Sequence, residues 1–145
     1  MTQGNCCLKV AVLAACAAVS GCYPAPYSQE FSGRDIDEDG KPVMDAFAVN
    51  LAYKECGSLG GKSTERLKSS VVRTDSSGRY RNHIRGISTF YTVLIGGCGS
   101  YSFESVACKA GFQPSNAGPA INAEFRLSPG IGWSHVDLPP ECSAK

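Results

Sequence analysis

The sequence predicts an all-β domain, a β-sandwich, on three observations. Glycine and proline are frequent, with 16 and 8 residues in a chain of 145, which is typical of a fold with many turns. Short runs rich in valine, isoleucine, phenylalanine and tyrosine alternate with polar residues, as half-buried strands do. No long amphipathic helix pattern follows residue 30. At this length we expect one domain with one core.

The overall charge points to no particular partner. Lysine and arginine together number 14, against 13 aspartate and glutamate residues. Strong binding to nucleic acid or to an acidic surface normally requires a basic excess. We therefore expect no nucleic-acid partner.

Residues 1–21 show the order of regions that is typical of a secretory signal peptide. One early positive charge, Lys9, precedes an apolar run from Val10 to Val19, and small residues follow. The run is shorter than the about 20 residues that a transmembrane helix needs. We interpret this segment as a signal peptide that is removed.

The stretch Val19-Ser20-Gly21-Cys22 closely resembles a bacterial lipobox. The resemblance implies a lipoprotein in which Cys22 is lipidated on sulfur, with palmitate-type chains, and becomes the new N-terminus. Buried methylenes contribute about 0.8 kcal/mol each, so several chains hold a protein durably on a membrane. The alternatives are an ordinary secretory signal or a buried structural cysteine. Cys16 also fits the motif, but cleavage there would leave only a stub of the hydrophobic run.

The residues after Cys22 indicate where the anchored protein resides. Tyr23 stands where lipoproteins retained in the inner membrane carry aspartate, so the resemblance implies the outer membrane, facing the periplasm. We expect residues 22–30 to form the lipidated cysteine and a Pro-bearing tether, which reaches roughly 25 Å at about 3.1 Å per residue. Residues 31–145 then form the domain.

A first short strand is followed by an acidic segment that imitates an EF-hand calcium loop. Asp35, Asp37 and Asp39 alternate, and Gly40 follows. An EF-hand also needs flanking helices and a bidentate carboxylate at its twelfth position, where this chain has Ala46. We expect a solvated hairpin turn with Gly40 at positive φ, and no metal or other cofactor. Weak binding at millimolar calcium stays open.

Two segments have the period of two that a strand requires. In AFAVNLAY, residues 46–53, we expect one face to point into the core; it carries Phe47, Val49, Leu51 and Tyr53. In INAEFRLS, residues 121–128, the expected inward residues are Ile121, Ala123, Phe125 and Leu127, and the polar residues between them face water.

The segment from Lys54 to Lys68 contains Gly61-Lys62-Ser63, which resembles the end of a P-loop. That motif requires glycine at position 56, where Cys56 stands, and no βαβ unit surrounds it. We expect a flexible loop that can serve as a contact surface.

The remaining strands are expected in pairs. VVRTDSSGRYR, residues 71–81, predicts two strands in a hairpin closed by Asp75 and Gly78. TFYTVLIGG, residues 89–97, is apolar on both faces, and we expect it to pair with SYSFESVACKAGF across a turn at Gly96–Gly99. With FSGRDI and WSHVDL at the two ends of the set, seven or eight strands make a sandwich.

The cysteines fit an oxidising compartment. Once the signal is removed and Cys22 is lipidated, four cysteines remain: Cys56, Cys98, Cys108 and Cys142. We expect two disulfides, each contributing about 2–4 kcal/mol. Zinc is disfavoured because no paired C-x-x-C spacing is present. Pairing of Cys98 with Cys108 is disfavoured because one lies in an expected turn and the other well along the next strand, which leaves Cys56 or Cys142 as partners.

Three motifs together resemble the carboxypeptidase regulatory-like domain. They are D-x-x-G-x-P at Asp37–Pro42, T-D-x-x-G-x-Y at Thr74–Tyr80, and K-x-G-F-x-P at Lys109–Pro114. The likeness covers most of residues 31–128. It implies a transthyretin-like (prealbumin-like) sandwich of seven strands and a mostly noncatalytic accessory or binding role. The Lys54–Lys68 segment and the cysteines depart from the simplest members.

Catalytic patterns are absent from the sequence. The transthyretin-like hydrolases end in Y-R-G-S, whereas this chain ends in LPPECSAK. His83 and His135 are the only histidines, and neither H-E-x-x-H nor G-x-S-x-G occurs. Trp133 and the tyrosines could form a sugar or peptide platform, although core packing is the commoner fate. We therefore expect no catalytic residues.

Three functions fit these features. The favoured one is a noncatalytic envelope lipoprotein that presents its sandwich to another envelope protein, at sheet edges or at the 54–68 loop. The second is an immunity or inhibitor lipoprotein against a periplasmic toxin or enzyme, which the size, disulfides and anchor also allow. The third is a hydrolase, which the missing motifs disfavour.

Overall fold

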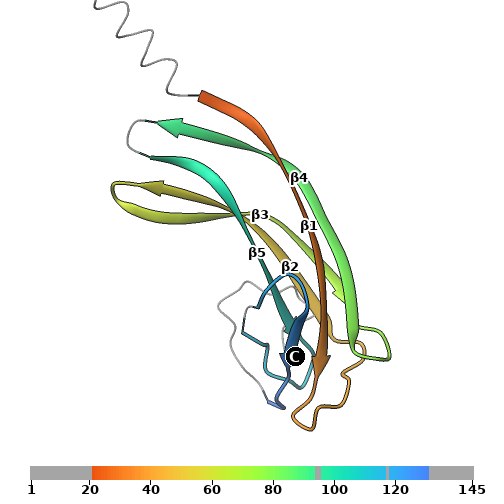
Figure 1. Cartoon of the computed structure of the whole chain (residues 1–145). Coiled ribbons are helices and arrows are strands. Elements are labelled where there is room, and N and C mark those ends of the chain that lie inside the picture. The colour runs from red at the N-terminus through yellow and green to blue at the C-terminus, as the bar shows by residue number, and fades with distance from the viewer. Residues whose placement is uncertain (1–20, 94–95, 117, 131–145) are drawn as a thin grey trace, which may run out of the picture.

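The computed structural model describes residues 21–93, 96–116 and 118–130. The expected signal peptide up to residue 20, the strand WSHVDL and the candidate residues Trp133, His135 and Cys142 lie outside these ranges. The described strands are β1 (Gly21–Ile36), β2 (Phe47–Ser58), β3 (Gly61–Arg73), β4 (Arg79–Val93), β5 (Gly96–Cys108) and β6 (Ala123–Arg126). They form one mixed sheet in the order β3-β2-β5-β4-β1-β6 (Figure 1). The expected all-β class is confirmed.

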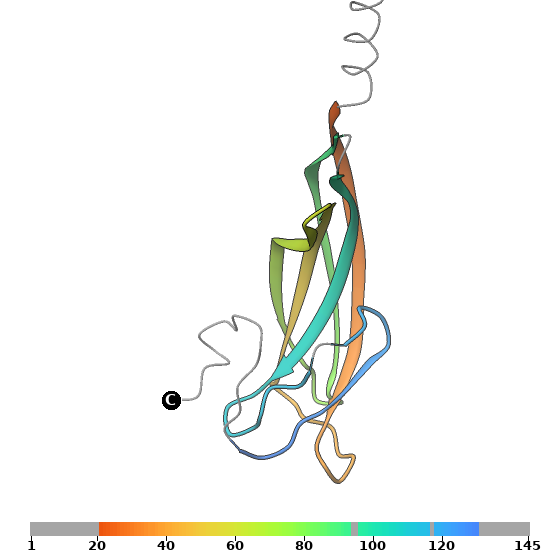
Figure 2. The ribbon, with the colours of Figure 1, turned by 90° about the vertical axis from the view of Figure 1, so that its left-hand side faces the viewer.

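The sheet folds over into a sandwich-like pair of layers. β4 and β5 pair only near their connection, from Tyr91–Cys98 to Val93–Gly96, and then diverge. One layer contains β3, β2 and β5, and the other contains β4, β1 and β6. Figure 2 shows β1 and β3 on opposite sides of the molecule. The β4–β5 connection therefore joins the layers at one end.

The main core fills the space between these layers. Its aromatic members come mainly from β1, β4 and β6, and are Tyr27, Phe31, Tyr80 and Phe125. Tyr101 and Phe103 of β5 pack against them. The facing residues of β2 are small, because the large rings opposite already occupy the space; Ala48 and Ala52 are both fully buried.

This packing corrects the expected orientation of β2. The face predicted to point into the main core instead forms a separate cluster on the other side of the strand, where Val49 and Leu51 pack with Val106 and Cys108. Both faces of β2 are buried there, so alternation alone identified the strand but assigned the main core to the wrong face.

The expected tether is part of the sheet. Residues 22–30 belong to β1 and pair with β4 in antiparallel register, with Cys22 opposite Tyr91 and Tyr27 opposite Gly86. Two prolines, Pro24 and Pro26, are accommodated because β6 pairs with β1 only from Gly33 onward. The start of β1 is thus an edge, where a strand tolerates residues without an N–H.

The expected flexible loop at residues 54–68 is a hairpin. β2 and β3 pair without interruption from Tyr53–Arg66 to Ser58–Gly61. Only Leu59 and Gly60 connect them, and Gly61 has a φ of 127°. The glycines that suggested a loop therefore close a tight turn.

The turn at Asp75–Gly78 is confirmed, but it does not close a hairpin. The Asp75 carboxylate accepts bonds from the N–H of Ser77 and the N–H of Arg79, and Gly78 has a φ of 71°. No ladder joins β3 to β4 among the described residues. The turn therefore carries the chain from one layer to the other.

The later strands differ in detail from expectation. β4 ends at Val93 and β5 begins at Gly96, so Cys98 lies in β5 rather than in a turn. β5 pairs with β2 from Gly96 to Cys108, and with β4 only from Gly96 to Cys98. In β4, Phe90 is buried and Tyr91 is exposed, so the strand is not apolar on two buried faces. In the last segment Ala123, Phe125 and Leu127 are buried as predicted, whereas Ile121 is exposed.

The described part of the chain has no helix that is long and apolar enough to cross a membrane.

Candidate functional site

The candidate lipidation site lies at the extreme end of β1. Cys22 is exposed and its thiol is free. Its neighbour Tyr23 packs edge-on against Phe90, with ring centroids 5.9 Å apart. No described residue beyond its chain neighbours lies within 4 Å of the position where Gly21 would carry a Cβ. The thiol is therefore accessible from solvent at the end of a fixed strand.

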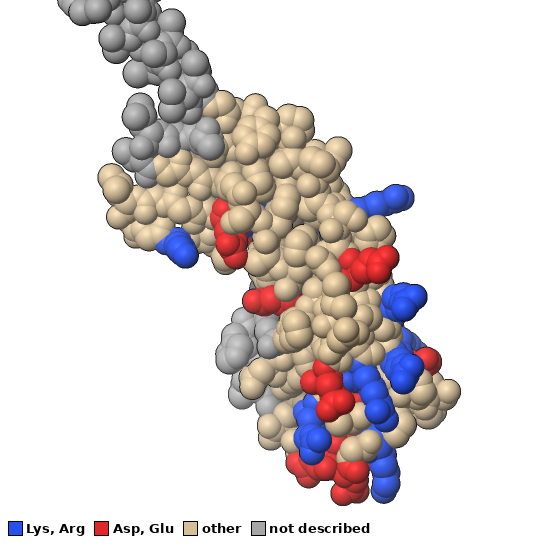
Figure 3. Space-filling model, viewed as in Figure 1, with Lys and Arg blue, Asp and Glu red and all other residues tan. Residues whose placement is uncertain are grey.

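The end of the sandwich that carries Cys22 is poor in charge. Figure 3 shows most charged side chains of this view over the opposite end of the molecule. Near Cys22, Tyr23 and Tyr91 are partly exposed, by 48% and 39%. An uncharged end with exposed tyrosines is chemically compatible with a lipid–water interface.

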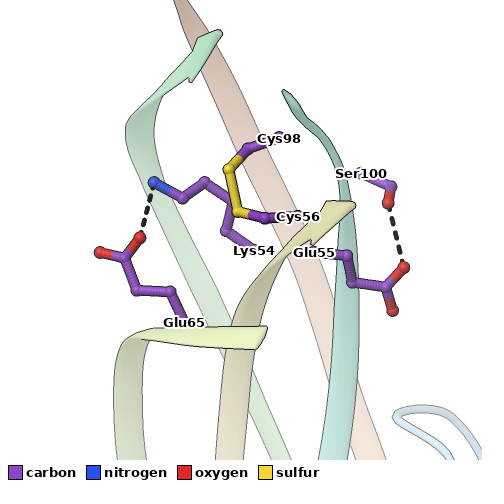
Figure 4. The surroundings of a disulfide bond; sticks show 6 residues. All are labelled: Lys54, Glu55, Cys56, Glu65, Cys98 and Ser100. Atoms are coloured by element: carbon purple, nitrogen blue, oxygen red, sulfur yellow. Dashed lines mark hydrogen bonds and ion pairs between the residues drawn. A yellow bond between two sulfur atoms is a disulfide. The ribbon is translucent and has the colours of Figure 1, made fainter. Parts of the chain in front are cut away.

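One of the disulfide pairings left open by the sequence is present. Cys56 of β2 lies directly opposite Cys98 of β5, and the two are bonded with Cα atoms 4.0 Å apart (Figure 4). The bond cross-links two strands that already share a ladder. The bond links β2 to β5 close to the β4–β5 connection.

Polar contacts flank this disulfide on both sides. Lys54 Nζ lies 2.7 Å from Glu65 Oε2, and the Ser100 hydroxyl donates to Glu55 Oε2 at 3.0 Å (Figure 4). A shallow cleft of about 340 Å³ opens beside them, lined in part by Lys62. The segment expected as a contact loop thus presents an ordered surface.

Cys108 is also disulfide-bonded, and its partner lies outside the described residues. The side chain is 1% exposed and packs with Val49 and Leu51. Of the two partners that the sequence left open, Cys56 is bonded to Cys98, so a pairing of Cys108 with Cys142 stays a prediction.

The structure does not bring the three carboxylates of the EF-hand-like segment together. Asp37 accepts a bond from the Lys41 N–H at 2.8 Å, and Asp39 lies 3.6 Å from Lys41 Nζ. With Gly40 at a φ of 79°, these contacts make the predicted turn. Within the described ranges, no group of three potential metal ligands occurs.

Asp35 departs from the expected solvated cluster. It is 0% exposed, and no described group bonds to its carboxylate oxygens. Burial raises the pKa of Asp35 to about 7, and burial likewise raises the pKa of nearby Tyr80. The sequence contained an indication of this burial, because Phe31, Gly33 and Asp35 are spaced two residues apart and therefore lie on the same face of β1.

The described histidine is an exposed strand residue. His83 lies in β4, and its Nε2 is 2.8 Å from the hydroxyl of Ser28 on β1. No described carboxylate is bonded to it. This contact ties two neighbouring strands together, and among the described residues no third group is bonded to the imidazole to orient it as in a Ser–His–Asp triad.

No protein-family model, no curated protein and no solved structure matches this chain.

Proposed function

We propose that the protein is a noncatalytic lipoprotein of the cell envelope, anchored through Cys22 to the outer membrane and presenting its β-sandwich in the periplasm as a binding or structural module. The observation that carries the proposal is the place of Cys22. The cysteine that completes the lipobox has an exposed, free thiol and lies at the start of β1, one residue after Gly21.

The geometry of β1 supports direct seating on the membrane. Because residues 22–30 are paired with β4, acyl chains on Cys22 would hold the end of the sandwich itself at the lipid surface. Tyr23 and Tyr91 would then lie at the level of the headgroups, where amphipathic aromatic rings are favoured. The charged opposite end would extend into the periplasm.

The carboxypeptidase regulatory-like assignment is part of this proposal. The motif residues that carry the resemblance occupy turns between strands, as Gly40, Gly78 and Gly111 show with positive φ values of 79°, 71° and 83°. The six described strands in two layers are compatible with a transthyretin-like sandwich of seven. A noncatalytic module is the role that such a domain most often has.

Metabolic labelling with an alkyne fatty acid tests the anchor. Wild-type protein and Cys16→Ser, the matched control at the competing motif, should incorporate the label and sediment with outer membranes. Cys22→Ser should incorporate none and should remain as a full-length precursor. A mature chain whose Cys22 carries an unmodified thiol would refute the proposal.

A further inference from the structure

The outward face of the β4-β1-β6 layer gathers arginines from adjacent strands. Arg34 of β1 lies directly opposite Arg79 of β4, and Ser32 lies opposite Arg81. On the other side of β1, Glu124 of β6 is the partner of Arg34. Because side chains alternate along a strand, these residues share one face.

This face is hollowed into a cleft. Its volume is about 530 Å³, within the range of small-ligand sites. Its lining includes Ser32, Arg34, Arg79, Arg81, Asn122 and Glu124.

Among the described residues, none of Arg34, Arg79 and Arg81 forms an ion pair with a carboxylate within 4 Å. The Nε of Arg34 is buried and makes no hydrogen bond. A buried donor without a partner is unfavourable, and like charges directly opposite each other in a ladder are destabilising. An anion in the cleft would relieve both.

The nearby carboxylates do not supply that anion. Asp75 is occupied by the turn, where it accepts bonds from the N–H and hydroxyl of Ser77 and from the N–H of Arg79. Glu124 is exposed and forms no ion pair with Arg34 within 4 Å. Three arginines facing two carboxylates leave a small positive excess, which suits a singly charged carboxylate better than a doubly charged phosphate.

We propose that this cleft binds a carboxylate side chain of an acidic peptide, with Arg34 and Arg81 as the principal donors. A planar carboxylate matches the fork of a guanidinium and can accept two parallel hydrogen bonds from it. Asn122 and the Ser32 hydroxyl, on the same face, can complete the polar shell.

The position of the cleft on β1 indicates where such a ligand comes from. Twelve residues separate Cys22 from Arg34 within one strand, which is about 40 Å of extended chain. If Cys22 is anchored as proposed above, the cleft is too far from the membrane to contact its headgroups. The peptide would therefore reach the cleft from the periplasm. The binding step itself does not depend on the anchor.

Isothermal titration of the native protein, purified in detergent whether or not it carries lipid, tests the proposal. The probe is a short acetylated and amidated oligoglutamate peptide, and an oligoglutamine peptide of equal length is its control. We expect oligoglutamate alone to bind, and to bind more weakly as salt rises. Arg81→Gln and Arg34→Gln should weaken binding about tenfold or more. Arg34→Lys keeps the positive charge but loses the two-pronged guanidinium, so its affinity for oligoglutamate should lie between those of wild type and Arg34→Gln.

Arg85→Gln is the matched control, because Arg85 lies on the same strand and face but outside the cleft, opposite Ser28. It should change the affinity less than twofold. Equal losses in Arg81→Gln and Arg85→Gln, at equal unfolding midpoints, would overturn the site. So would Arg81-dependent binding of inorganic phosphate, or of phosphatidylglycerol vesicles, in place of the peptide. Since lipidation does not enter the titration, its failure is distinguishable from failure of the anchor.

Discussion

Tyr27 of β1 lies directly opposite Gly86 of β4, and its ring covers the position where a side chain would otherwise stand. A Cβ at Gly86 would lie 2.5 Å from the tyrosine hydroxyl oxygen and 2.6 Å from Cζ. The ring has little freedom to move, because it packs against Tyr101 and Phe103 at centroid distances of 5.1 and 6.5 Å. The close approach of two strands here depends on glycine.

Gly86→Ala should therefore destabilise the domain by about 1–3 kcal/mol, the usual effect of forcing an extra carbon into a packed core. The free energy of unfolding in urea measures it. Gly57→Ala is the control, since nothing lies within 4 Å of a Cβ there, and it should have little effect. Equal stability of the two variants would contradict the packing described.

Removing the Cys56–Cys98 disulfide should lower the free energy of unfolding by about 2–4 kcal/mol. The bond closes a segment with a sequence separation of 42 residues, and its main effect is to restrict the unfolded chain. The double variant Cys56→Ala/Cys98→Ala leaves Cys108 intact and can be compared with wild type by urea unfolding. The single variant Cys56→Ala should lose nearly as much, because the bond matters more than either side chain. An unchanged midpoint in the double variant would count against this account.

The stability of the protein should depend on pH through Asp35. Its pKa is raised from 3.8 to about 7 in the folded protein, so between those values the folded state retains a proton that the unfolded state has lost. Stability then falls as pH rises through this window, by up to about 1.4 kcal/mol per pH unit.

Asp35→Asn should remove this component, and the variant should gain stability relative to wild type between pH 4 and pH 7. Thermal unfolding midpoints across that range measure the difference. Asp39→Asn, in the exposed turn, is the matched control and should follow the wild-type curve. Parallel curves for wild type and Asp35→Asn would show that the buried carboxyl does not titrate as described.

Thr74 should be sensitive to loss of its hydroxyl. The buried Oγ1 donates to the Val43 carbonyl at 2.7 Å and accepts from the Ala46 N–H at 3.0 Å. Thr74→Val keeps the shape but leaves both backbone groups without this partner, which should cost about 1–3 kcal/mol. Thr64→Val, on the exposed part of β3, should be nearly neutral in the same chemical unfolding assay. A neutral Thr74→Val would contradict the importance of these two hydrogen bonds.

Local chemistry made the turns predictable from the sequence. Asp75 and Gly78 close their turn through bonds that span only four residues, so the residues themselves contain the information. Gly40 is a similar case. The sequence also identified β2 and β6 by their alternation, because a period of two follows directly from strand geometry.

Partners and burial depend on distant residues, and here the sequence was less informative. Alternation in β5 does not reveal that its main partner is β2, from which β3 and β4 separate it along the chain, rather than the adjacent β4. Pro24 and Pro26 suggested a tether, because proline is rare inside strands. They are tolerated in β1 because β6 pairs only with the later part of that strand, which the local sequence does not reveal. Asp35 resembled its solvated neighbours, although its side chain faces the core. The cleft became visible only when the register placed Arg34 across from Arg79.

The continuous pairing of β1 with β4 also bears on mechanical load. A pull on Cys22 along the strand would act on the ladder from Gly21–Thr92 to Arg34–Arg79 in shear, so its hydrogen bonds would have to break together rather than one after another. If Cys22 carries the proposed anchor, the ladder between β1 and β4 should therefore resist unfolding by a force applied at that end.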